Sequence, residues 1–408
     1  MTALFPDVAG PRLVLGPGVR RMPWAAARQV AGEVATPLPA ETRRLGDAVG
    51  HALAAPLTAL TDLPAFDTSA MDGWAVAGPG PWALLSDGIS VGHVPEPLVT
   101  GAARRIATGA PVPAGTSAVL RLEDGFAAGQ VLHSAVDVAA GRDIRPRGQE
   151  CVTGTMLVDA GTTVTSALLG LAAAAGHDDL LVHRKPSVQV LVTGDELLQS
   201  GLPGAGRVRD ALGPLLVPWL AGAGATLQDK VALSDDPAAL RAQLRDCQAD
   251  VIITTGSTSV GPTDLLHRLL PEEGARFLVD SVAVRPGHPM LLVQLAAGPG
   301  GQRRWLVGLP GNPLAAIGGL VTLALPLLRG LGGHRAPEPL RLPAATPIQG
   351  HPADVRLIPA TVTGGAVRPL RFDGPAMLRG MALADLLAVI TPGGAPEGTL
   401  VETIPWNA

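Results

Sequence analysis

The middle of the chain alternates short apolar runs with longer amphipathic stretches, as a doubly wound α/β fold does. The apolar runs, rich in β-branched residues, predict strands at 187–192, 226–233, 251–255, 278–284, 290–295 and 305–307. The amphipathic stretches predict helices at 212–222, 237–247, 262–273 and 314–331. We therefore expect an α/β domain at residues 183–332.

On both sides of this segment the pattern changes to short strands separated by Gly, Pro and Asp. Such strands are predicted at 118–122, 131–136, 355–363, 386–390 and 400–404. Helices are expected at 24–34, from about residue 40 and at 166–175. The chain is thus predicted to be a multidomain α/β protein with β-rich segments on either side of its α/β domain.

The composition narrows the class of protein. The chain has 408 residues, of which 47% are hydrophobic and 16% are charged, and this describes a folded protein with several domains. A net charge of −4 creates no overall positive field that would attract nucleic acid. The apolar runs are broken well short of the length needed to span a membrane. Two cysteines are too few for a disulfide framework or a zinc site. We expect a cytoplasmic protein that binds neither nucleic acid nor membrane.

The strand at 251–255 leads into a loop of small residues that ends at Asp264. The small residues of this loop include Gly256, Ser257, Ser259 and Gly261. A strand, a loop of small residues and a helix start leave backbone N–H groups unpaired at a sheet edge, where phosphates and oxyanions bind. Asp264 would then be a metal ligand or an acid–base group. For this stretch alone the favoured alternative is an ordinary tight turn in which Asp264 stabilises the helix dipole.

Three further loops follow predicted strands and carry polar groups. Residues 193–196 offer carboxylates, 285–289 form a fixed turn with two potential cations, and 309–313 form a rigid loop before a helix. Because the carboxyl ends of parallel strands meet at one edge, these groups should converge there. Carboxylates and basic groups together suit a phosphate compound held by Mg²⁺. Nucleophile elbows, a Walker A loop and a dinucleotide fingerprint are absent.

Five motifs carry a resemblance to a known family. They are Asp-Thr-Ser-Ala-Met-Asp-Gly-Trp-Ala-Val ending at 76, Thr-Gly-Ala-Pro-Val-Pro ending at 113, Ile-Arg-Pro-Arg-Gly ending at 148, Thr-Gly-Asp-Glu-Leu ending at 197 and Gly-Leu-Pro-Gly-Asn-Pro ending at 313. In this order they resemble the molybdopterin molybdenumtransferases, the family of bacterial MoeA proteins and the E domain of gephyrin. The similarity runs from about residue 18 to the C-terminus.

The resemblance implies a fold of four domains. These are an elongated N-terminal domain made from segments 18–45 and 141–182, an inserted β lid at 46–140, the doubly wound molybdopterin-binding α/β domain at 183–332, and a small C-terminal β barrel at 337–408. The family's cleft forms between the α/β domain of one subunit and the lid of its partner. A homodimer with a shared active site is therefore expected.

The reaction implied by the resemblance is insertion of molybdate into adenylylated molybdopterin, with Mg²⁺-dependent release of AMP. Asp72, Glu196 and Asp264 match catalytic carboxylates of the family, and Glu196, Asp236 and Asp264 would hold the Mg²⁺. Substrate would be bound by a set of loop residues: Thr108, Gly194, Gly256, Ser257, Ser259, Gly261, Arg285, His288, Pro310, Asn312 and Pro313. Partner proteins implied are a molybdopterin adenylyltransferase and recipient molybdenum enzymes.

The chain departs from the family in the proposed anion site, where Arg285 and His288 replace two lysines. Arginine grips an oxyanion bidentately, whereas histidine is only partly charged near neutral pH. If His288 binds the anion as a cation, activity at limiting molybdate should fall between roughly pH 6 and 8. The alternative is that His288 packs beside Pro289 and that Arg285 alone carries the anion.

Two other functions stay open. One is a non-catalytic paralogue that binds molybdopterin or partner proteins, as the resemblance to gephyrin permits. The other is a molybdopterin adenylyltransferase, which acts one step earlier. The motif ending at Val76, which lies in the expected lid, and the whole N-terminal half argue against the second alternative, because such an enzyme would not need them.

Overall fold

The computed structural model describes residues 20–258, 265–298 and 301–406. These residues fall into two units, which we describe separately. Of the described residues, the α/β unit takes those up to Glu41, Gly50–Ala52 and those from His183 onward, and the β-rich unit takes Thr42–Val49 and Leu53–Val182.

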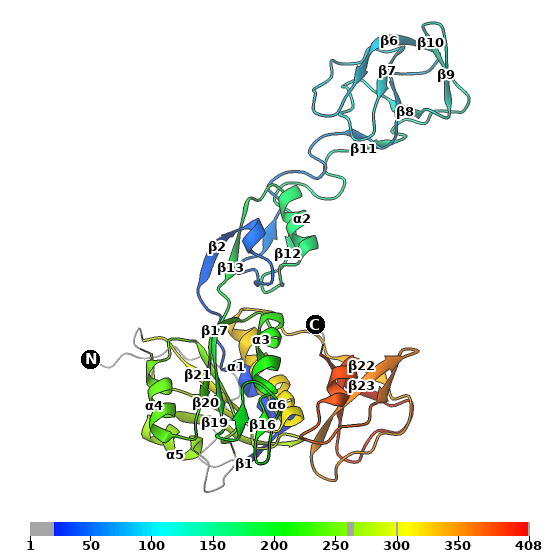
Figure 1. Cartoon of the computed structure of the whole chain (residues 1–408). Coiled ribbons are helices and arrows are strands. Elements are labelled where there is room, and N and C mark those ends of the chain that lie inside the picture. Colours follow the sequence, from blue (N-terminus) through cyan, green and yellow to red (C-terminus); the bar gives the residue numbers. More distant parts are fainter. Residues whose placement is uncertain (1–19, 259–264, 299–300, 407–408) are drawn as a thin grey trace. The chain divides into compact units, whose positions relative to one another are not determined.

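A mixed sheet forms the centre of the α/β unit (Figure 1). Its first six strands are, in spatial order, β17 (Thr226–Leu233), β14 (Ser187–Thr193), β18 (Val251–Thr255), β21 (Trp305–Leu309), β20 (Leu291–Gln294) and β19 (Arg276–Arg285). The first four run parallel, and β20 is antiparallel to both of its neighbours. The carboxyl ends of β17, β14, β18, β21 and β19 consequently lie at one edge of the sheet.

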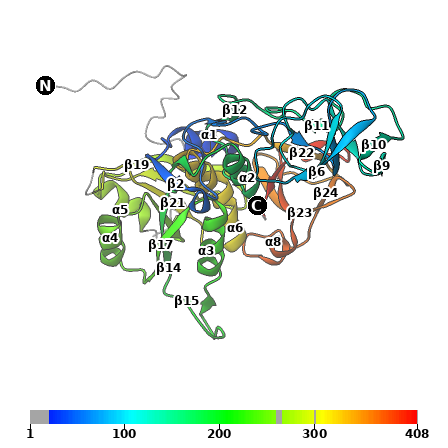
Figure 2. The same ribbon diagram turned by 90° about the horizontal axis from the view of Figure 1, so that it is seen from above.

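Helices cover both faces of this sheet (Figures 1 and 2). The helices are α1 (Trp24–Glu33), α3 (Leu212–Gly222), α4 (Pro237–Asp246), α5 (Leu266–Glu272), α6 (Pro313–Gly319) and α7 (Leu325–Leu331), with a π-helical turn at Leu320–Ala324. Successive side chains of a strand point to opposite faces of the sheet. In β18, Ile252 therefore belongs to the core formed with the leucines of α4 and α5, whereas Ile253 belongs to the core formed with α1, α3 and α6. This confirms the predicted doubly wound fold.

The predicted start of α4 at residue 237 is confirmed. Asp236 is its N-cap and accepts a hydrogen bond from the Ala238 N–H at 2.9 Å. Pro237 occupies the first helical position, where its missing N–H costs nothing. Pro313 likewise opens α6, although the Asn312 side chain before it makes no capping hydrogen bond.

The C-terminal strands extend the same sheet. Strand β23 (Val355–Thr363) pairs in parallel with the end of β19, and β25 (Leu386–Ile390), β26 (Leu400–Pro405) and β22 (Leu340–Pro343) follow in spatial order. Two shorter elements are β24 (Ala366–Pro369), which pairs with β23, and helix α8 (Arg379–Leu383). Ile358, Val367 and Ile390 form a separate core for these strands. The pairing with β19 places C-terminal residues beside the functional loops.

One stretch, Pro313–Leu331, is long and apolar enough to cross a membrane by length and composition, contrary to our expectation that every apolar run is too short. Within the α/β unit 78% of its most apolar window is buried. Leu320, Leu323 and Leu327 have no exposed surface. The stretch is therefore the central helix of a protein core.

The β-rich unit is built on a six-stranded sheet. Its strands are, in spatial order, β8 (Ala118–Arg121), β5 (Gly73–Val76), β7 (Ala102–Ile106), β6 (Trp82–Ile89), β10 (Val131–Ser134) and β9 (Gly125–Ala128). Smaller pairs join β11 (Ile144–Arg145) to β4 (Thr68–Ser69) and β12 (Met156–Val158) to β3 (Leu57–Thr58). Helix α2 (Ser166–Ala174) is capped by the Thr165 hydroxyl. The motif that ends at Val76 spans β4, the turn after it and β5 (Gly73–Val76).

The helix predicted from about residue 40 is wrong. Ala40–Arg44 form strand β2, which pairs with β13 (Asp179–His183), and a short 3₁₀ turn at Leu45–Asp47 follows. The residues of β2 have adequate helix propensity but include no large apolar side chain that a helix could bury. Pairing with β13 satisfies their backbone groups instead.

Candidate active site

Three of the predicted loops meet at the carboxyl edge of the sheet, after β14, β18 and β21. The Thr193 hydroxyl donates a hydrogen bond to the Thr255 carbonyl at 2.7 Å. The Gly256 N–H donates to the Leu309 carbonyl at 2.8 Å. A Cβ atom at Gly311 would lie 3.7 Å from the Gly256 Cα. The three loops therefore touch one another, as expected from the strand order.

The loop after β18 is described only as far as Thr258. Gly256 and Ser257 have φ angles of 85° and 54°, so both lie in the left-handed region. Because the Gly256 N–H is bonded to Leu309, this donor is not available to a phosphate. Ser259, Gly261 and Asp264, which we predicted to bind phosphate and metal, lie outside the described residues.

Carboxylates gather at the ends of the neighbouring strands β14 and β17. The Asp235 N–H donates to the Asp195 carboxylate at 3.3 Å, which brings the two loops together. Glu196 is exposed, and its carboxylate oxygens would lie 2.7 and 2.9 Å from a Cβ at Gly194. Gly194, with φ of 143°, therefore leaves the space that this carboxylate takes. Asp195 is one of the carboxylates expected in residues 193–196, whereas Asp235 was not predicted, although it directly adjoins Asp236.

A Mg²⁺ site fits the chemistry of these donors but is only partly described. Hard oxygen ligands of the kind offered by Glu196 and Asp236 are what Mg²⁺ prefers. Asp236 uses one carboxylate oxygen to cap α4. Among the residues that the structure describes, no three His, Cys, Asp or Glu side chains are grouped closely enough to hold a metal ion. The third predicted ligand, Asp264, falls outside that set.

A pocket of about 370 Å³ brings four predicted substrate residues together. We call it the polar pocket, and its lining includes Arg285, His288, Pro310 and Asn312. C-terminal residues complete it: Arg356, Leu357, Asp373 and Pro375. The sequence did not point to Arg356 or Asp373, because only the pairing of β19 with β23 brings them to this edge.

The turn after β19 is held tightly against α6. Gly287 has φ of 105°, and a Cβ there would lie 2.5 Å from the Ala315 carbonyl oxygen. A larger residue would therefore push the turn away from the helix. Gly287 thus fixes the positions of Arg285 and His288 beside the helix start.

The two predicted cations of this turn differ in their electrostatics. The Arg285 Nε–H donates to the Asp354 carboxylate at 2.9 Å. Partial desolvation of the exposed ring lowers the pKa of His288, and the charges of Arg285 and Arg21 lower it further, against a weaker opposing effect of Asp354. His288 is therefore neutral at neutral pH, and the pH window that we expected from an ordinary histidine moves downward.

In the β-rich unit the predicted pair Asp72 and Thr108 is in direct contact. The Thr108 N–H and hydroxyl donate to one oxygen of the Asp72 carboxylate, at 2.7 and 3.0 Å. These two hydrogen bonds lower the pKa of Asp72, with a small further contribution from Arg105. Asp72 is thus an ionised, exposed carboxylate with one oxygen already bonded.

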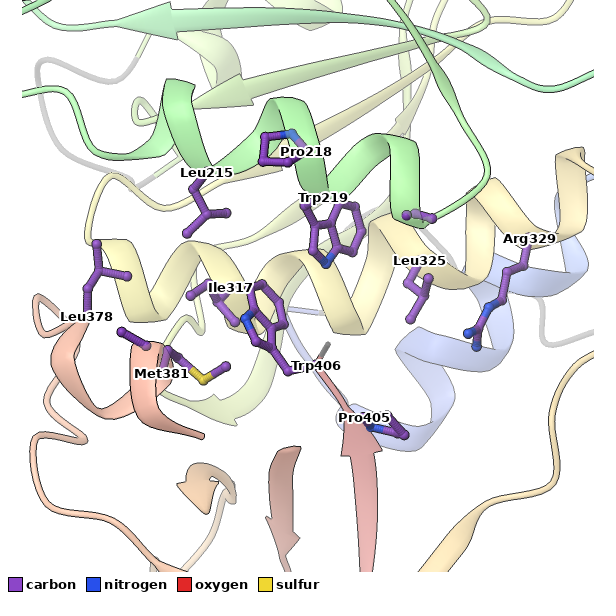
Figure 3. A pocket seen from close by; sticks show the side chains of 13 residues that line it. Leu215, Pro218, Trp219, Ile317, Leu325, Arg329, Leu378, Met381, Pro405 and Trp406 are labelled. Carbon is purple, nitrogen blue, oxygen red and sulfur yellow. The ribbon is translucent and has the colours of Figure 1, made fainter. Parts of the chain in front are cut away.

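A second pocket in the α/β unit, about 440 Å³, is of a different kind (Figure 3). We call it the apolar groove. Trp219 of α3 and Trp406 stack across it with ring centroids 6.5 Å apart, Met381 of α8 lies at one end, and Arg329 lies at the other. Its lining contains none of the described residues predicted for the site.

Family models match the chain in three consecutive parts. The MoeA N-terminal region (domain I and II) matches residues 22–176, the probable molybdopterin binding domain matches 189–330, and the MoeA C-terminal region (domain IV) matches 341–406. The α/β unit and the β-rich unit are thus both covered.

Comparison with individual proteins indicates the same family as the family models. The molybdopterin molybdenumtransferase of Synechococcus elongatus is 31% identical over 342 residues, which are 80% of this chain and 84% of that protein. That of Staphylococcus aureus is 28% identical over 389 residues, 91% of each chain. A crystal structure of the molybdopterin biosynthesis MoeA protein from Pyrococcus horikoshii supports the fold, with a TM-score of 0.80 over 95% of this chain and all of that one, at 19% identity. With this identity over most of its length, the chain belongs to the molybdopterin molybdenumtransferase family.

Proposed function

We propose that the chain inserts molybdate into the dithiolene of adenylylated molybdopterin and releases AMP. As a member of its family it is a transferase of molybdenum cofactor biosynthesis. The observation that carries the proposal is the polar pocket, where Arg285, His288 and Asn312 meet at the same sheet edge as the carboxylate of Glu196. An anion-binding pocket at the same sheet edge as carboxylates suits a reaction that joins an oxyanion to a phosphorylated substrate.

Arg285 is the group proposed to bind molybdate. A guanidinium offers several N–H donors in a planar fork, so it holds an oxyanion through more than one hydrogen bond. Arg356, which also lines the pocket, is engaged inside the protein: it donates to the Asp373 carboxylate and to the Gln349 carbonyl, both at 2.7 Å. Asn312, exposed at the N-cap of α6, would contribute further polar contacts.

Mg²⁺ is the proposed cofactor. Glu196 and Asp236 would hold it together with Asp264, and the bound ion would neutralise charge on the adenylyl phosphate. Gly194 would let the Glu196 carboxylate approach, and Asp236 would remain fixed by its bond to the start of α4.

A homodimer with a shared site is proposed from the family resemblance. Asp72 and Thr108 would then complete the site on the partner's α/β unit. Mixing an Asp72→Ala variant with a Glu196→Gln variant should restore part of the activity, because one of the two sites in a hybrid dimer carries neither change. No rescue, once subunit exchange is verified, would reject a shared site.

The reaction itself is tested with purified protein, adenylylated molybdopterin, Mg²⁺ and molybdate. We expect AMP release together with formation of active molybdenum cofactor, and the loss of both when Mg²⁺ is chelated. Pterin binding without AMP release would point to a non-catalytic paralogue. Formation of adenylylated molybdopterin from molybdopterin and ATP would point to an adenylyltransferase instead.

The protein would act in the cytoplasm. A molybdopterin adenylyltransferase would supply its substrate, and molybdenum enzymes would receive its product. Co-purification of the chain with either class of protein would test these partners.

A further inference from the structure

Asp354 is a buried carboxylate immediately behind the polar pocket. It directly precedes β23, and its side chain is 1% exposed. One carboxylate oxygen accepts a hydrogen bond from a terminal amino group of Arg21, and the other accepts from the Arg285 Nε–H at 2.9 Å. The carboxylate therefore ties the pocket's arginine to the N-terminal segment and to the C-terminal strands.

His351 does not change the charge of this group. Its Nδ1 accepts hydrogen bonds from the backbone N–H groups of Asp354 and Ala353, at 3.0 and 3.2 Å. A ring nitrogen that accepts carries no proton. The approach of this nitrogen to the Asp354 carboxylate, 3.6 Å, is therefore not an ion pair. Two arginines share one carboxylate, and the group as a whole keeps a positive charge.

The same contacts keep Asp354 ionised. Burial alone would raise its pKa, but the hydrogen bonds and charges of Arg21 and Arg285 outweigh burial, and the pKa lies below its ordinary value. A buried carboxylate held in this way is a rigid acceptor, because moving it would leave a charge unpaired in the interior.

The hydrogen bond from the Arg285 Nε–H to Asp354 limits which N–H groups of the guanidinium can bind an anion. It occupies one side of the planar fork, and Arg285 itself lines the polar pocket. We propose that Asp354 is a positioning residue: it holds the Arg285 guanidinium through Nε so that the terminal amino groups receive the oxyanion. This inference rests on the proposed function, in which Arg285 binds molybdate.

The two ways in which Asp354 could act, through its charge or by orienting Arg285, predict opposite changes in anion affinity. If Asp354 acted only through its negative charge, removing it would strengthen binding of an anion in the pocket. If it orients Arg285, removing it weakens binding, since the guanidinium loses its fixed direction. Removing such supporting groups around metal ligands typically costs 10- to 100-fold in affinity, and we expect about tenfold weaker molybdate binding for Asp354→Ala.

The test is a double-mutant cycle on the full chain, with the molybdate Kd measured by equilibrium dialysis. Asp354→Ala should raise the Kd about tenfold in the wild-type background but leave it within about twofold in an Arg285→Ala background. As a matched control, Asp373→Asn alters a carboxylate that pairs with Arg356 in the same pocket. Its effect should be the same in both backgrounds.

Folding is checked by thermal unfolding of every variant. If Asp354→Ala does not fold, Asp354→Asn and Arg285→Lys replace it. The amide weakens the hold on the guanidinium, and the lysine keeps the charge without the Nε fork, so each should weaken binding about tenfold. Either tighter binding by the Asp354 variants, or an unchanged Kd for Arg285→Lys, would overturn the proposal.

The outcomes separate this inference from the proposed function. No effect of Arg285→Ala on the Kd would reject the anion site, and with it any role of Asp354 in that site. A large effect of Arg285→Ala, with an equal effect of Asp354→Ala in both backgrounds, would reject only the positioning role. Equal coupling by the Asp373→Asn control would show that the coupling reflects the general charge of the pocket, and this too would reject positioning.

Discussion

The polar pocket and the apolar groove of the α/β unit are both lined by one long helical stretch but differ in chemistry. Ala315 of the stretch Pro313–Leu331 lines the polar pocket, and Ile317 and Leu325 of the same stretch line the apolar groove. The groove is the larger pocket, about 440 against 370 Å³, yet Arg329 is its only charged lining residue among those that the structure describes. Burial lowers the pKa of that arginine.

The polar pocket combines Arg285, Arg356 and Asp373 with His288 in a smaller space. Its charged groups are held by partners, as in the pairs of Arg285 with Asp354 and of Arg356 with Asp373. The volume of a pocket therefore depends on how helices and strands pack. Its binding chemistry depends on which side chains lie at the ends of the strands. Substitutions that affect one pocket and spare the other test this distinction.

The largest effect is expected from Glu196→Gln at the strand edge. A carboxylate that holds Mg²⁺ should matter at least as much as a supporting group, so AMP release should fall by roughly 100-fold or more. Glu196 is exposed, and the fold should not change. The control is Met381→Leu in the groove, a change of similar volume that should leave AMP release unaffected. Turnover at the wild-type rate by Glu196→Gln would contradict the assignment of this edge.

The apolar groove should matter for stability instead. Trp219→Ala removes the stack on Trp406, and for a partly buried tryptophan we expect a loss of about 2 kcal/mol in the free energy of unfolding. This corresponds to roughly a 30-fold change in the unfolding equilibrium. Chemical denaturation measures the loss, and dialysis measures the molybdate Kd below the transition. If Trp219→Ala changed the molybdate Kd as strongly as it changes the stability, the two pockets would not be functionally distinct.

The sequence predicted more of the fold than of the site. Strands such as Leu386–Ile390 and the start of α4 follow from local patterns of apolar residues and caps, which a sequence displays directly. The error at Ala40–Arg44 arose because pairing with a distant strand outweighed local propensity.

From strand patterns alone, site residues could be predicted only where they adjoin a recognisable strand end, whereas Asp72 and Thr108 were predicted from the family resemblance. Arg285 and His288 were found at such a strand end, and the structure places both in one pocket. Asp354 lies 69 residues from Arg285 along the chain and carries no signal of its own. Its position depends on the register of β23 against β19, which local patterns do not specify.

A direct comparison of two arginines should show a smaller effect. Arg285→Ala in the polar pocket removes the charge-assisted contact with the anion, and a net loss of about 1.5 kcal/mol should weaken molybdate binding about tenfold. Arg329→Ala in the groove removes the same charge and should leave the Kd within about twofold. Equal losses from both variants would show that molybdate responds to overall charge and not to the polar pocket.

The smallest effect concerns His288 and its dependence on pH. Because partial desolvation, Arg285 and Arg21 lower its pKa below the ordinary value near 6.5, the imidazole is mostly neutral at pH 7 and above. A neutral ring adds no attraction for an anion, so wild-type molybdate binding should be flat between about pH 7 and 8. It should tighten only below about pH 6.5, since the bound dianion favours the protonated ring.

His288→Lys places a charge at this position that persists throughout that range of pH. For an exposed side chain such a charge is worth no more than about 1 kcal/mol, and we expect the Kd at pH 8 to fall about threefold. The pH profile of the variant should also be flat below pH 6.5, because lysine does not titrate there. Superimposable Kd values and profiles for wild type and variant would show that His288 does not contact the anion. Arg285, oriented by Asp354, would then carry the anion alone.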